Sequence, residues 1–223
     1  MSHDFRTIGL FAGIGGLELG LEAAGSTTVG LCEIESSAQV VLRKTWGDVP
    51  IWNDVRSLKR IPRAEVMTAG FPCQDLSQAG RKAGITGSQS SLVEHVLRLM
   101  ASRSAPKTLI LENVSYMLRL DSGRGMAYLT SALEELGLRW AYRVVDARSF
   151  GMPQRRQRVL LVASKTADPK QILLADDEGA AFSTKDTIGP IVKSSYYGFY
   201  WTEGLRGLGW AREAVPTVKG GSA

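Results

Sequence analysis

Short apolar segments alternate with amphipathic ones through residue 164 of the chain. The apolar segments, which predict β-strands, cover residues 7–11, 28–33, 65–70, 108–112, 139–145 and 158–163. Segments with the apolar spacing of a helix cover residues 15–24, 36–46, 92–102 and 125–136. In the first of these helices, Leu17, Leu21 and Ala24 are expected to share one face. Alternating strands and helices predict an α/β fold with a doubly wound, mostly parallel sheet.

This pattern changes after Ser164. Helical periodicity fades, glycine becomes frequent, and aromatic residues gather at Tyr196, Tyr197, Phe199, Tyr200, Trp201 and Trp210. We therefore predict two domains, residues 1–164 and residues 165–223, the second being the start of a smaller unit. A loop rich in Gly, Ser and Gln covers residues 72–91, and loops of that length in compact domains usually serve a function.

The composition narrows the class of protein. A chain of 223 residues can bury a full α/β core, and its 44% hydrophobic content argues against disorder. The two cysteines, Cys32 and Cys73, make neither a disulfide framework nor a zinc site. We therefore expect no bound metal and a reducing cytoplasm. We also expect neither a signal peptide nor a membrane span, because the sequence has no apolar run of the required kind.

The net charge of +5 is concentrated in one region. Residues 101–160 carry ten basic and five acidic residues, whereas basic and acidic residues balance in the rest of the chain. Between Arg139 and Arg158 there are six arginines and one acid, Asp146. Arginine suits planar, bidentate partners such as phosphates and base edges, although a solvated basic face is an equal alternative.

Cys73 follows a short apolar run and a proline, at the start of the polar loop. In open α/β sheets, ligands bind beyond the carboxyl ends of the strands, so this position favours a nucleophile. A small packed residue is the competing interpretation, because free cysteines are often simply buried.

The glycines after the first predicted strand point to a cofactor. Gly13, Gly15 and Gly16 let the backbone approach a ligand at a helix N-terminus. Glu33 ends the second strand twenty residues after Gly13, where a carboxylate typically binds ribose hydroxyls. Glu18 breaks the spacing of a dinucleotide-binding motif, so a nucleoside without a diphosphate fits better than a nicotinamide cofactor. A plain tight turn is the simpler alternative.

Two further groups complete the candidate chemistry. Glu112 ends the fourth long strand and is a candidate proton donor, or else a structural hydrogen-bonding group. Gln154, Arg156 and Arg158 precede the last predicted strand. If Arg158 begins that strand, Arg156 shares its face and Arg155 points away. Two guanidiniums and an amide on one side suit a polar ring and its phosphate.

Taken together, the motifs resemble the C5-cytosine DNA methyltransferase family over residues 7–163. The matching blocks are Leu10-Phe11-Ala12-Gly13-Ile14-Gly15-Gly16, Gly70-Phe71-Pro72-Cys73-Gln74, Leu111-Glu112-Asn113-Val114 and Phe150-Gly151-Met152-Pro153-Gln154-Arg155-Arg156-Gln157-Arg158. The Pro216-Thr217 pair resembles the family more loosely, near its target-recognition region.

The resemblance implies a Rossmann-like, class I methyltransferase fold and S-adenosylmethionine as the cofactor. By this resemblance, Cys73 would attack C6 of a cytosine flipped out of double-stranded DNA, Glu112 would protonate or hydrogen-bond N3, and Arg158 would hold O2. Gln154 and Arg156 would order the loop and the DNA backbone. The residues expected at the cofactor are Phe11, Gly13, Gly15, Gly16 and Glu33, with Ile34 on the adenine, Asp54 facing its amino group, and Phe71 and Pro72 lining the pocket.

The chain also departs from the family pattern. Gly9 stands where the family often has an acidic residue. The family normally continues beyond residue 223, so we expect activity to need a further C-terminal part, supplied as a separate fragment or subunit. We expect the enzyme to belong to a restriction–modification system and to act in the cytoplasm of a bacterial or phage-type host cell. A tRNA cytosine-5 methyltransferase and a catalytically silent DNA- or partner-binding relative are the alternatives.

Overall fold

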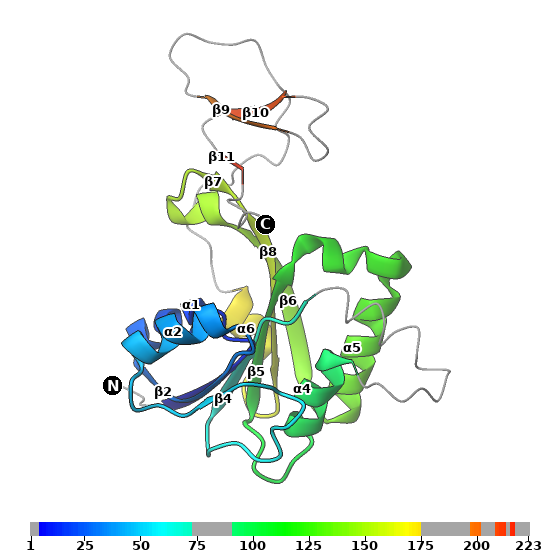
Figure 1. Cartoon of the computed structure of the whole chain (residues 1–223). Helices are drawn as coiled ribbons and strands as arrows, with labels where there is room; N and C mark the ends of the chain where they lie inside the picture. Colours follow the sequence, from blue (N-terminus) through cyan, green and yellow to red (C-terminus); the bar gives the residue numbers. More distant parts are fainter. Residues whose placement is uncertain (1–4, 73–90, 175–196, 202–207, 213–214, 217–223) are drawn as a thin grey trace. The chain divides into compact units, whose positions relative to one another are not determined.

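The computed structural model describes residues 5–72, 91–174, 197–201, 208–212 and 215–216 (Figure 1). The helices are α1 (Gly16–Ala23), α2 (Ser36–Thr45), α4 (Leu92–Met100), α5 (Arg124–Glu135) and α6 (Pro169–Leu173), with 3₁₀ turns η1 (Ser115–Leu118), η2 (Leu120–Gly123) and η3 (Ala147–Phe150). The strands are β1 (Phe5–Leu10), β2 (Ser26–Cys32), β3 (Ile51–Trp52), β4 (Val66–Ala69), β5 (Thr108–Val114), β6 (Arg139–Asp146), β7 (Gln154–Arg155), β8 (Gln157–Ser164), β9 (Tyr197–Trp201), β10 (Leu208–Arg212) and β11 (Val215–Pro216).

Seven strands form the main sheet in the order β3-β2-β1-β4-β5-β8-β6. The pairs β3/β2, β2/β1, β1/β4 and β4/β5 are all parallel. The predicted α/β fold with a doubly wound, mostly parallel sheet is therefore confirmed. Elements begin and end within a few residues of the predicted positions, but the alternation of apolar segments did not reveal the two-residue strands β3 and β7.

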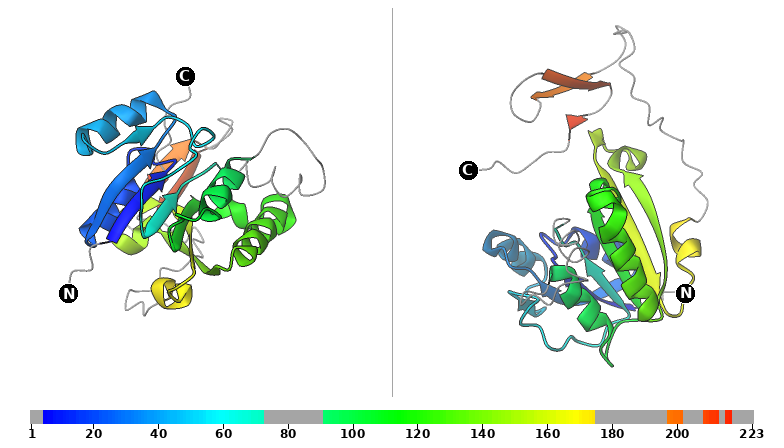
Figure 2. Two further views of the ribbon diagram at one scale, coloured as in Figure 1. Left: turned by 90° about the horizontal axis from the view of Figure 1, so that it is seen from below. Right: turned by 90° about the vertical axis from the view of Figure 1, so that its right-hand side faces the viewer.

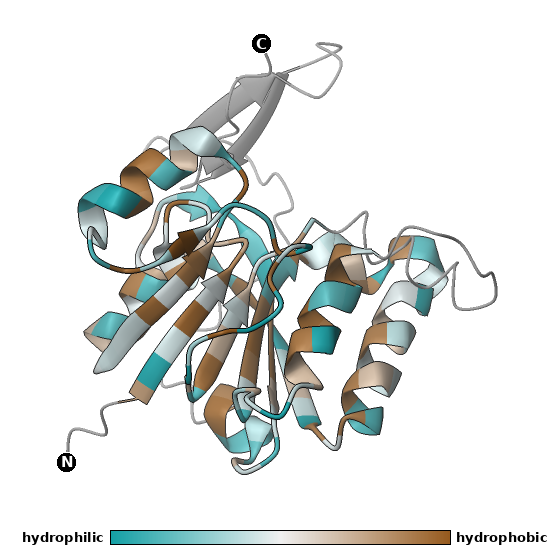
Figure 3. Cartoon of the chain, turned by 60° about the horizontal axis from the view of Figure 1, so that its bottom comes forward, coloured by the Kyte–Doolittle hydropathy of each residue, from teal (hydrophilic) through white to brown (hydrophobic). Residues whose placement is uncertain are grey.

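Helices cover both faces of this sheet, with α1 and α2 on one side and α4 and α5 on the other (Figures 1 and 2). Ile8 and Leu10 of β1 pack in the larger core together with residues of α4 and α5, whereas Leu31 of β2 packs with Leu42 and Trp46 on the α2 side. Figure 3 shows apolar residues concentrated along the strands of the sheet. Burial of both faces explains why the strands read as continuous apolar runs.

The face of α1 that meets the sheet differs from the prediction. Leu17 and Leu21 are half-buried and Ala24 is exposed, so Ala24 does not belong to the buried face. The one buried residue of the helix is Glu18. The positions of apolar residues do not predict this buried face, because the residue at its centre is a glutamic acid.

The chain divides into two compact units that interleave along the sequence. The first unit comprises Met1–Arg143 and Val159–Ala175, and the second comprises Val144–Arg158 and Asp176–Ala223. Residues 144–158, which the sequence analysis placed in the first domain, thus group with the C-terminal residues. No helix in the described part of the chain is long and apolar enough to cross a membrane.

Candidate active site

The strand order reverses at β1, which places a candidate site at the end of that strand. From β1 the chain runs outward through β2 to β3, and it then returns to β4 on the other side of β1. In open α/β sheets, ligands bind outside the carboxyl ends of the strands at such a reversal. The two strand ends are joined directly, because the Gly70 N–H donates to the Leu10 carbonyl at 3.3 Å.

The turn after β1 is held in an unusual backbone conformation. Phe11 has a φ of 54°, in the left-handed region that few non-glycine residues adopt. Gly13 and Gly15 also have positive φ values, 56° and 85°. A Cβ atom on Gly15 would collide with the Trp46 ring, whereas one on Gly13 would meet no atom within 4 Å. Gly15 is therefore required by both backbone and packing, and Gly13 by backbone alone.

Helix α1 begins immediately after this turn. Gly15 is its N-cap, and no side chain of the described residues caps this end through a hydrogen bond. A Cβ on Gly16 would meet nothing within 4 Å, so the first turn of the helix is open. The N-terminal N–H groups of a helix carry partial positive charge and suit a polar or anionic ligand.

Glu33, the predicted ribose ligand, braces this turn. Its Oε2 accepts the Gly13 N–H at 2.7 Å, and its Oε1 accepts the Glu35 N–H at 2.8 Å. Each carboxylate oxygen keeps a second acceptor position. The next residue, Ile34, is 65% exposed and offers an apolar surface beside the turn. The structure thus brings Gly13, Glu33 and Ile34 to one place.

The segment after β4 lies against the turn after β1. The rings of Phe11 and Phe71 make an edge-to-face contact with centroids 6.4 Å apart. Phe71 is buried and Pro72 is exposed. The buried Asn113 of β5 donates from Nδ2 to the Phe71 carbonyl at 2.9 Å and accepts the Val114 N–H through Oδ1. In the sequence, Asn113 is only one member of a motif, and its role as a link between strand ends is visible only in the structure.

Glu112 reaches the same strand ends. An ideal Cβ atom on Gly70 would lie 3.6 Å from Glu112 Oε2 and 3.7 Å from the Phe11 carbonyl oxygen. The carboxyl group of Glu112 therefore lies beside the backbone three residues before Cys73. Cys73 itself lies outside the described residues, and its position next to Glu112 stays a prediction.

The other cysteine is a poor candidate for a nucleophile. Cys32 is buried at the end of β2, and burial, together with the charges of Asp54 and Glu33, raises the pKa of its thiol to about 12. A thiol with such a pKa supplies almost no thiolate at neutral pH, and the thiolate is the reactive form. Cys73 is consequently the better candidate of the two for nucleophilic chemistry.

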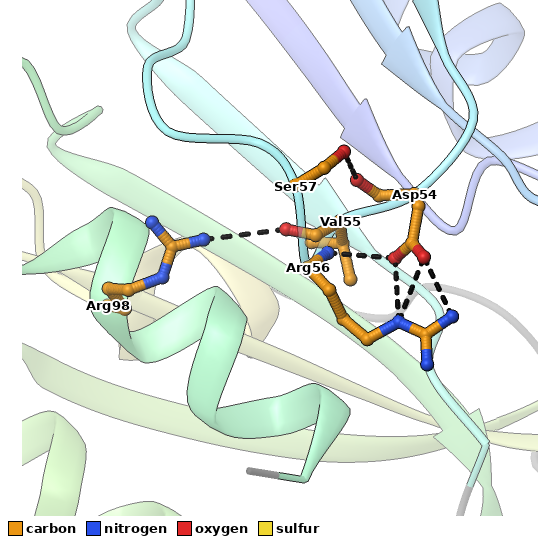
Figure 4. Close-up of polar contacts among 5 residues, drawn as sticks. All are labelled: Asp54, Val55, Arg56, Ser57 and Arg98. Atoms are coloured by element: carbon orange, nitrogen blue, oxygen red, sulfur yellow. Dashed lines mark hydrogen bonds and ion pairs between the residues drawn. The ribbon is translucent and has the colours of Figure 1, made fainter. Parts of the chain in front are cut away.

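Asp54 belongs to the turn after β3, and Arg56 donates to its carboxylate. The backbone N–H and Nε of Arg56 donate to Oδ1 at 2.8 and 3.0 Å, and its Nη2 lies 2.7 Å from Oδ2 (Figure 4). These hydrogen bonds lower the pKa of the Asp54 carboxyl, which is therefore an anionic acceptor at neutral pH. The described contacts place Asp54 beside Arg56, and its predicted role toward an adenine stays a prediction.

Glu18 is a buried acid whose function the sequence alone does not indicate. Gly9 is paired with Leu31 on one side and with Thr68 on the other, and the Glu18 carboxyl covers it, so that a Cβ on Gly9 would collide with it. The Thr68 hydroxyl donates to Oε1, whereas the buried Oε2 has no partner in the described part of the chain. Burial raises the pKa of this carboxyl. The family resemblance predicts an acid at position 9, where this chain has glycine, and Glu18 brings a carboxyl to that place from α1.

In the second unit, the segment of Gln154 and the arginines is held by backbone contacts. β7 pairs in parallel with β11, so that Val215 lies opposite Gln154 and Pro216 opposite Arg155. The Arg156 carbonyl accepts the Ala147 N–H at 3.0 Å. The motif containing Pro216, which is distant in the sequence, is thus a direct neighbour of this segment.

The expected alternation of these arginines applies only in part. Strand β8 begins at Gln157, and Arg156 lies between β7 and β8, so a period of two cannot be extended across it. Arg155 is half-buried, with its Nε buried, and Arg158 is half-buried with Nη1 donating to the Gln157 carbonyl at 2.8 Å. Because of this break, strand alternation does not place Arg156 and Arg158 on one face. The roles of Gln154, Arg156 and Arg158 stay predictions.

Two other arginines of the basic region bind backbone carbonyls. Arg139 is exposed and donates to the Ala167 carbonyl at 3.0 Å. Arg143 is half-buried and donates to the Leu173 carbonyl at 3.1 Å. Part of the basic surplus therefore serves to hold the residues after β8.

Comparison with known proteins adds independent evidence. The sequence profile of the family described as C-5 cytosine-specific DNA methylase matches residues 5–200. The type II methyltransferase M2.BsuMI of Bacillus subtilis (strain 168) is 50% identical over 224 residues, which cover 98% of this chain and 57% of the relative. The type II methyltransferase M.MspI of Moraxella sp is 30% identical over 213 residues, which cover 92% of this chain and 48% of the relative. This chain thus spans about half the length of these curated relatives.

Solved structures show the same architecture. The S. pombe Dnmt2 methyltransferase matches with a TM-score of 0.58 and 18% identity, covering 74% of this chain and 52% of that one. The Entamoeba histolytica methyltransferase EhMeth matches with a TM-score of 0.58 and 20% identity, covering 74% of this chain and 54% of that one. At these identities the likeness concerns the fold.

Proposed function

Because this chain belongs to the C-5 cytosine-specific DNA methylase family, we propose that it is the catalytic part of a DNA (cytosine-5-)-methyltransferase that uses S-adenosylmethionine. The observation that carries the proposal is the meeting of Phe11, Gly70 and Glu112 at the reversal of the strand order. Each of these residues belongs to a different one of the four family motifs, and Cys73 follows Gly70 by three residues.

The residues around the first turn fit a nucleoside cofactor without a diphosphate. Glu33 offers acceptor positions beside the turn of Gly13, Gly15 and Gly16, and Ile34 offers an exposed apolar surface for the adenine. Phe11, Phe71 and Pro72 form the wall toward the catalytic loop, and Asp54 accepts from the amino group of the base. S-adenosylmethionine, when bound, supplies an electrophilic methyl group.

The catalytic residues activate the cytosine. The Cys73 thiolate forms a bond to C6, and Glu112 gives a proton or a hydrogen bond to N3, so that C5 becomes an enamine carbon and a nucleophile. Arg158 holds O2, while Gln154 and Arg156 order the loop and the DNA backbone. The cytosine is extruded from the duplex because C6 is otherwise hidden in the base stack.

The partners follow from the same proposal. Double-stranded DNA is the substrate, and the basic region supplies phosphate contacts. We assign residues 1–164 to catalysis, including residues 144–158 of the second compact unit, and residues 165–223 to the start of target recognition. A C-terminal segment equivalent to the part of the relatives outside the alignment completes the enzyme. The setting is a restriction–modification system in a bacterial cytoplasm.

A mechanism-based trap tests this function. DNA containing 5-fluorocytosine is incubated with S-adenosylmethionine and the protein, with the C-terminal segment of a relative supplied in a parallel sample. Fluorine blocks the final elimination, so a covalent complex through Cys73 is expected to persist and to be located by mass spectrometry. A Cys73→Ser protein that traps as efficiently as the parent refutes the assignment.

The same assay separates DNA from RNA as the substrate. A duplex DNA and a tRNA transcript, each carrying 5-fluorocytosine, are compared at equal concentration. Trapping of DNA alone is the expected result, and trapping of tRNA alone would replace the proposed substrate.

A further inference from the structure

An arginine of α4 holds the turn after β3. Arg98 lies in the last turn of α4, and its Nη2 donates to the Leu58 carbonyl at 2.8 Å and to the Val55 carbonyl at 3.4 Å. Figure 4 shows Arg98 reaching from the helix to the turn. The side chains of Val55 and Leu58 are buried in the main core. The turn is thus anchored by packing on one side and by a charged donor on the other.

One peptide group connects Arg98 to the Asp54 carboxylate. The carbonyl of the Val55–Arg56 peptide accepts from Arg98, and the N–H of the same peptide donates to Asp54 Oδ1 at 2.8 Å. A peptide group is planar, so the direction of its carbonyl fixes the direction of its N–H. A hydrogen bond to the Arg98 cation also polarises the group and strengthens its N–H as a donor.

The side chain of Arg56 holds the same carboxylate through a more exposed contact. Its guanidinium is 2.7 Å from Asp54, but the side chain of Arg56 is 59% exposed and that of Asp54 is 28% exposed. Exposed ion pairs contribute little free energy, so this guanidinium can move when another donor approaches. The backbone N–H of Arg56 cannot move in this way, because Arg98 and the buried neighbours fix its peptide.

We propose that Arg98 is a positioning residue for recognition of the adenine amino group, acting through the Val55–Arg56 peptide on the carboxylate of Asp54. The proposal rests on the proposed function, in which the adenine of S-adenosylmethionine lies at Asp54. Arg98 does not touch the ligand. It sets the position of the acceptor that does.

A pair of ligands that differ at the 6-position of the purine, and in the proton that a 6-oxo purine carries on N1, tests this role. S-adenosylhomocysteine has a 6-amino donor, and S-inosylhomocysteine has a 6-oxo group that cannot donate to Asp54. Calorimetry measures both affinities for the parent, Arg98→Gln, Arg98→Lys and the control Arg103→Gln. Arg103 is an exposed arginine just beyond the end of α4. Melting temperatures are recorded in parallel.

The parent is expected to prefer S-adenosylhomocysteine. Arg98→Gln should weaken binding of that ligand about tenfold, the effect of disturbing one hydrogen bond to a charged group, and leave S-inosylhomocysteine unchanged. Arg98→Lys keeps the charge without the fork of donors and should discriminate to an intermediate degree. If Arg98→Gln does not fold, the affinities of Arg98→Lys for the two ligands are compared with those of the parent instead. Arg103→Gln should behave as the parent.

Other outcomes overturn the proposal in distinguishable ways. Equal loss of both ligands in the Arg98 variants, or a lower melting temperature with unchanged discrimination, shows that Arg98 supports only the fold. Unchanged discrimination at unchanged stability overturns the positioning role as well. A parent that binds neither ligand, even with the C-terminal segment of a relative supplied, overturns the proposed function, and this inference with it.

Discussion

Gly15 shows how one residue is fixed by two physical demands. Its φ of 85° suits glycine, and the ring of Trp46 occupies the space where a Cβ would lie. Neither constraint applies to the next residue, Gly16. Its φ is not positive, and a Cβ there would meet no atom within 4 Å. The two adjacent glycines therefore form a matched pair for experiment.

Gly15→Ala is expected to lower the free energy of unfolding by about 2–4 kcal/mol, the sum of a left-handed backbone and an overpacked ring. Gly16→Ala should change it by less than about 1 kcal/mol. Urea unfolding of both variants measures the difference. Equal effects of the two substitutions would contradict the steric account of the turn.

Glu18, also at the scale of a single residue, should make the free energy of unfolding depend on pH. Its pKa is raised by burial, against an ordinary value of 4.5 in the unfolded chain. The unfolded chain therefore loses this proton at a lower pH than the folded protein. The contribution of the protonated group to stability is complete below the unfolded pKa and is lost as the pH rises through the folded pKa.

Glu18→Gln has no proton to lose, so its stability relative to the parent should rise with pH over the acid range. Urea unfolding of both proteins at several values between about pH 4 and pH 8 measures this difference. Taking the difference removes the contributions of Asp54, Glu65 and Asp146, which are common to both. A difference that does not depend on pH would mean that Glu18 keeps its ordinary pKa.

At the scale of elements, the ends of β4 and β5 are joined by Asn113. Its amide donates to the Phe71 carbonyl, and its carbonyl oxygen accepts the Val114 N–H. At the opposite end of β5, the Thr108 hydroxyl is 3.0 Å from that of Ser164. One strand thus carries two side-chain links, one at the candidate site and one far along the strand.

Asn113→Ala is expected to cost about 1–3 kcal/mol of stability and to reduce the rate of methyl transfer, because it releases the backbone before Cys73. Thr108→Val should cost stability on a similar scale and leave the rate unchanged. Urea unfolding and single-turnover methylation with the completed enzyme measure both effects. Equal rates in the two variants would show that Asn113 only stabilises the sheet.

At the scale of the whole molecule, the basic surplus has more than one use. The structure places Arg139 on the surface and leaves Arg143 half-buried against a carbonyl. Of these two, only Arg139 is exposed enough to meet a phosphate without rearrangement. Arg158 lies in the other unit, within the motif proposed to hold the extruded base.

Arg158→Ala should abolish methyl transfer and leave much of the DNA affinity, because its proposed partner is a base. Arg139→Ala should reduce the salt dependence of DNA binding by about one unit of slope and leave the single-turnover rate at saturating DNA unchanged. DNA titrations at several salt concentrations, paired with single-turnover methylation, separate the two. An Arg158→Ala protein that keeps its rate and loses only salt-sensitive affinity would refute the base-holding role.

The sequence by itself determined the helices and the longer strands of the main sheet, because hydrophobic periodicity is a local property that tertiary packing here reinforces; the two-residue strand β3 is too short for it to reveal. It also indicated a glycine turn after the first strand, because glycine permits a positive φ, but the structure decided that Gly13 and Gly15 adopt one and Gly16 does not. The four motifs, in order, identified the family before any geometry was known. Their roles in catalysis stay predictions.

Only the tertiary structure decided which distant residues meet. It showed Glu18 over Gly9, Asn113 tied to Phe71, Pro216 beside Arg155, and Arg98 bonded to the turn of Asp54. None of these pairs lies at a spacing that periodicity can reveal. A buried carboxyl is indistinguishable from a surface one in sequence, because burial is a property of what packs around it and not of the residue itself.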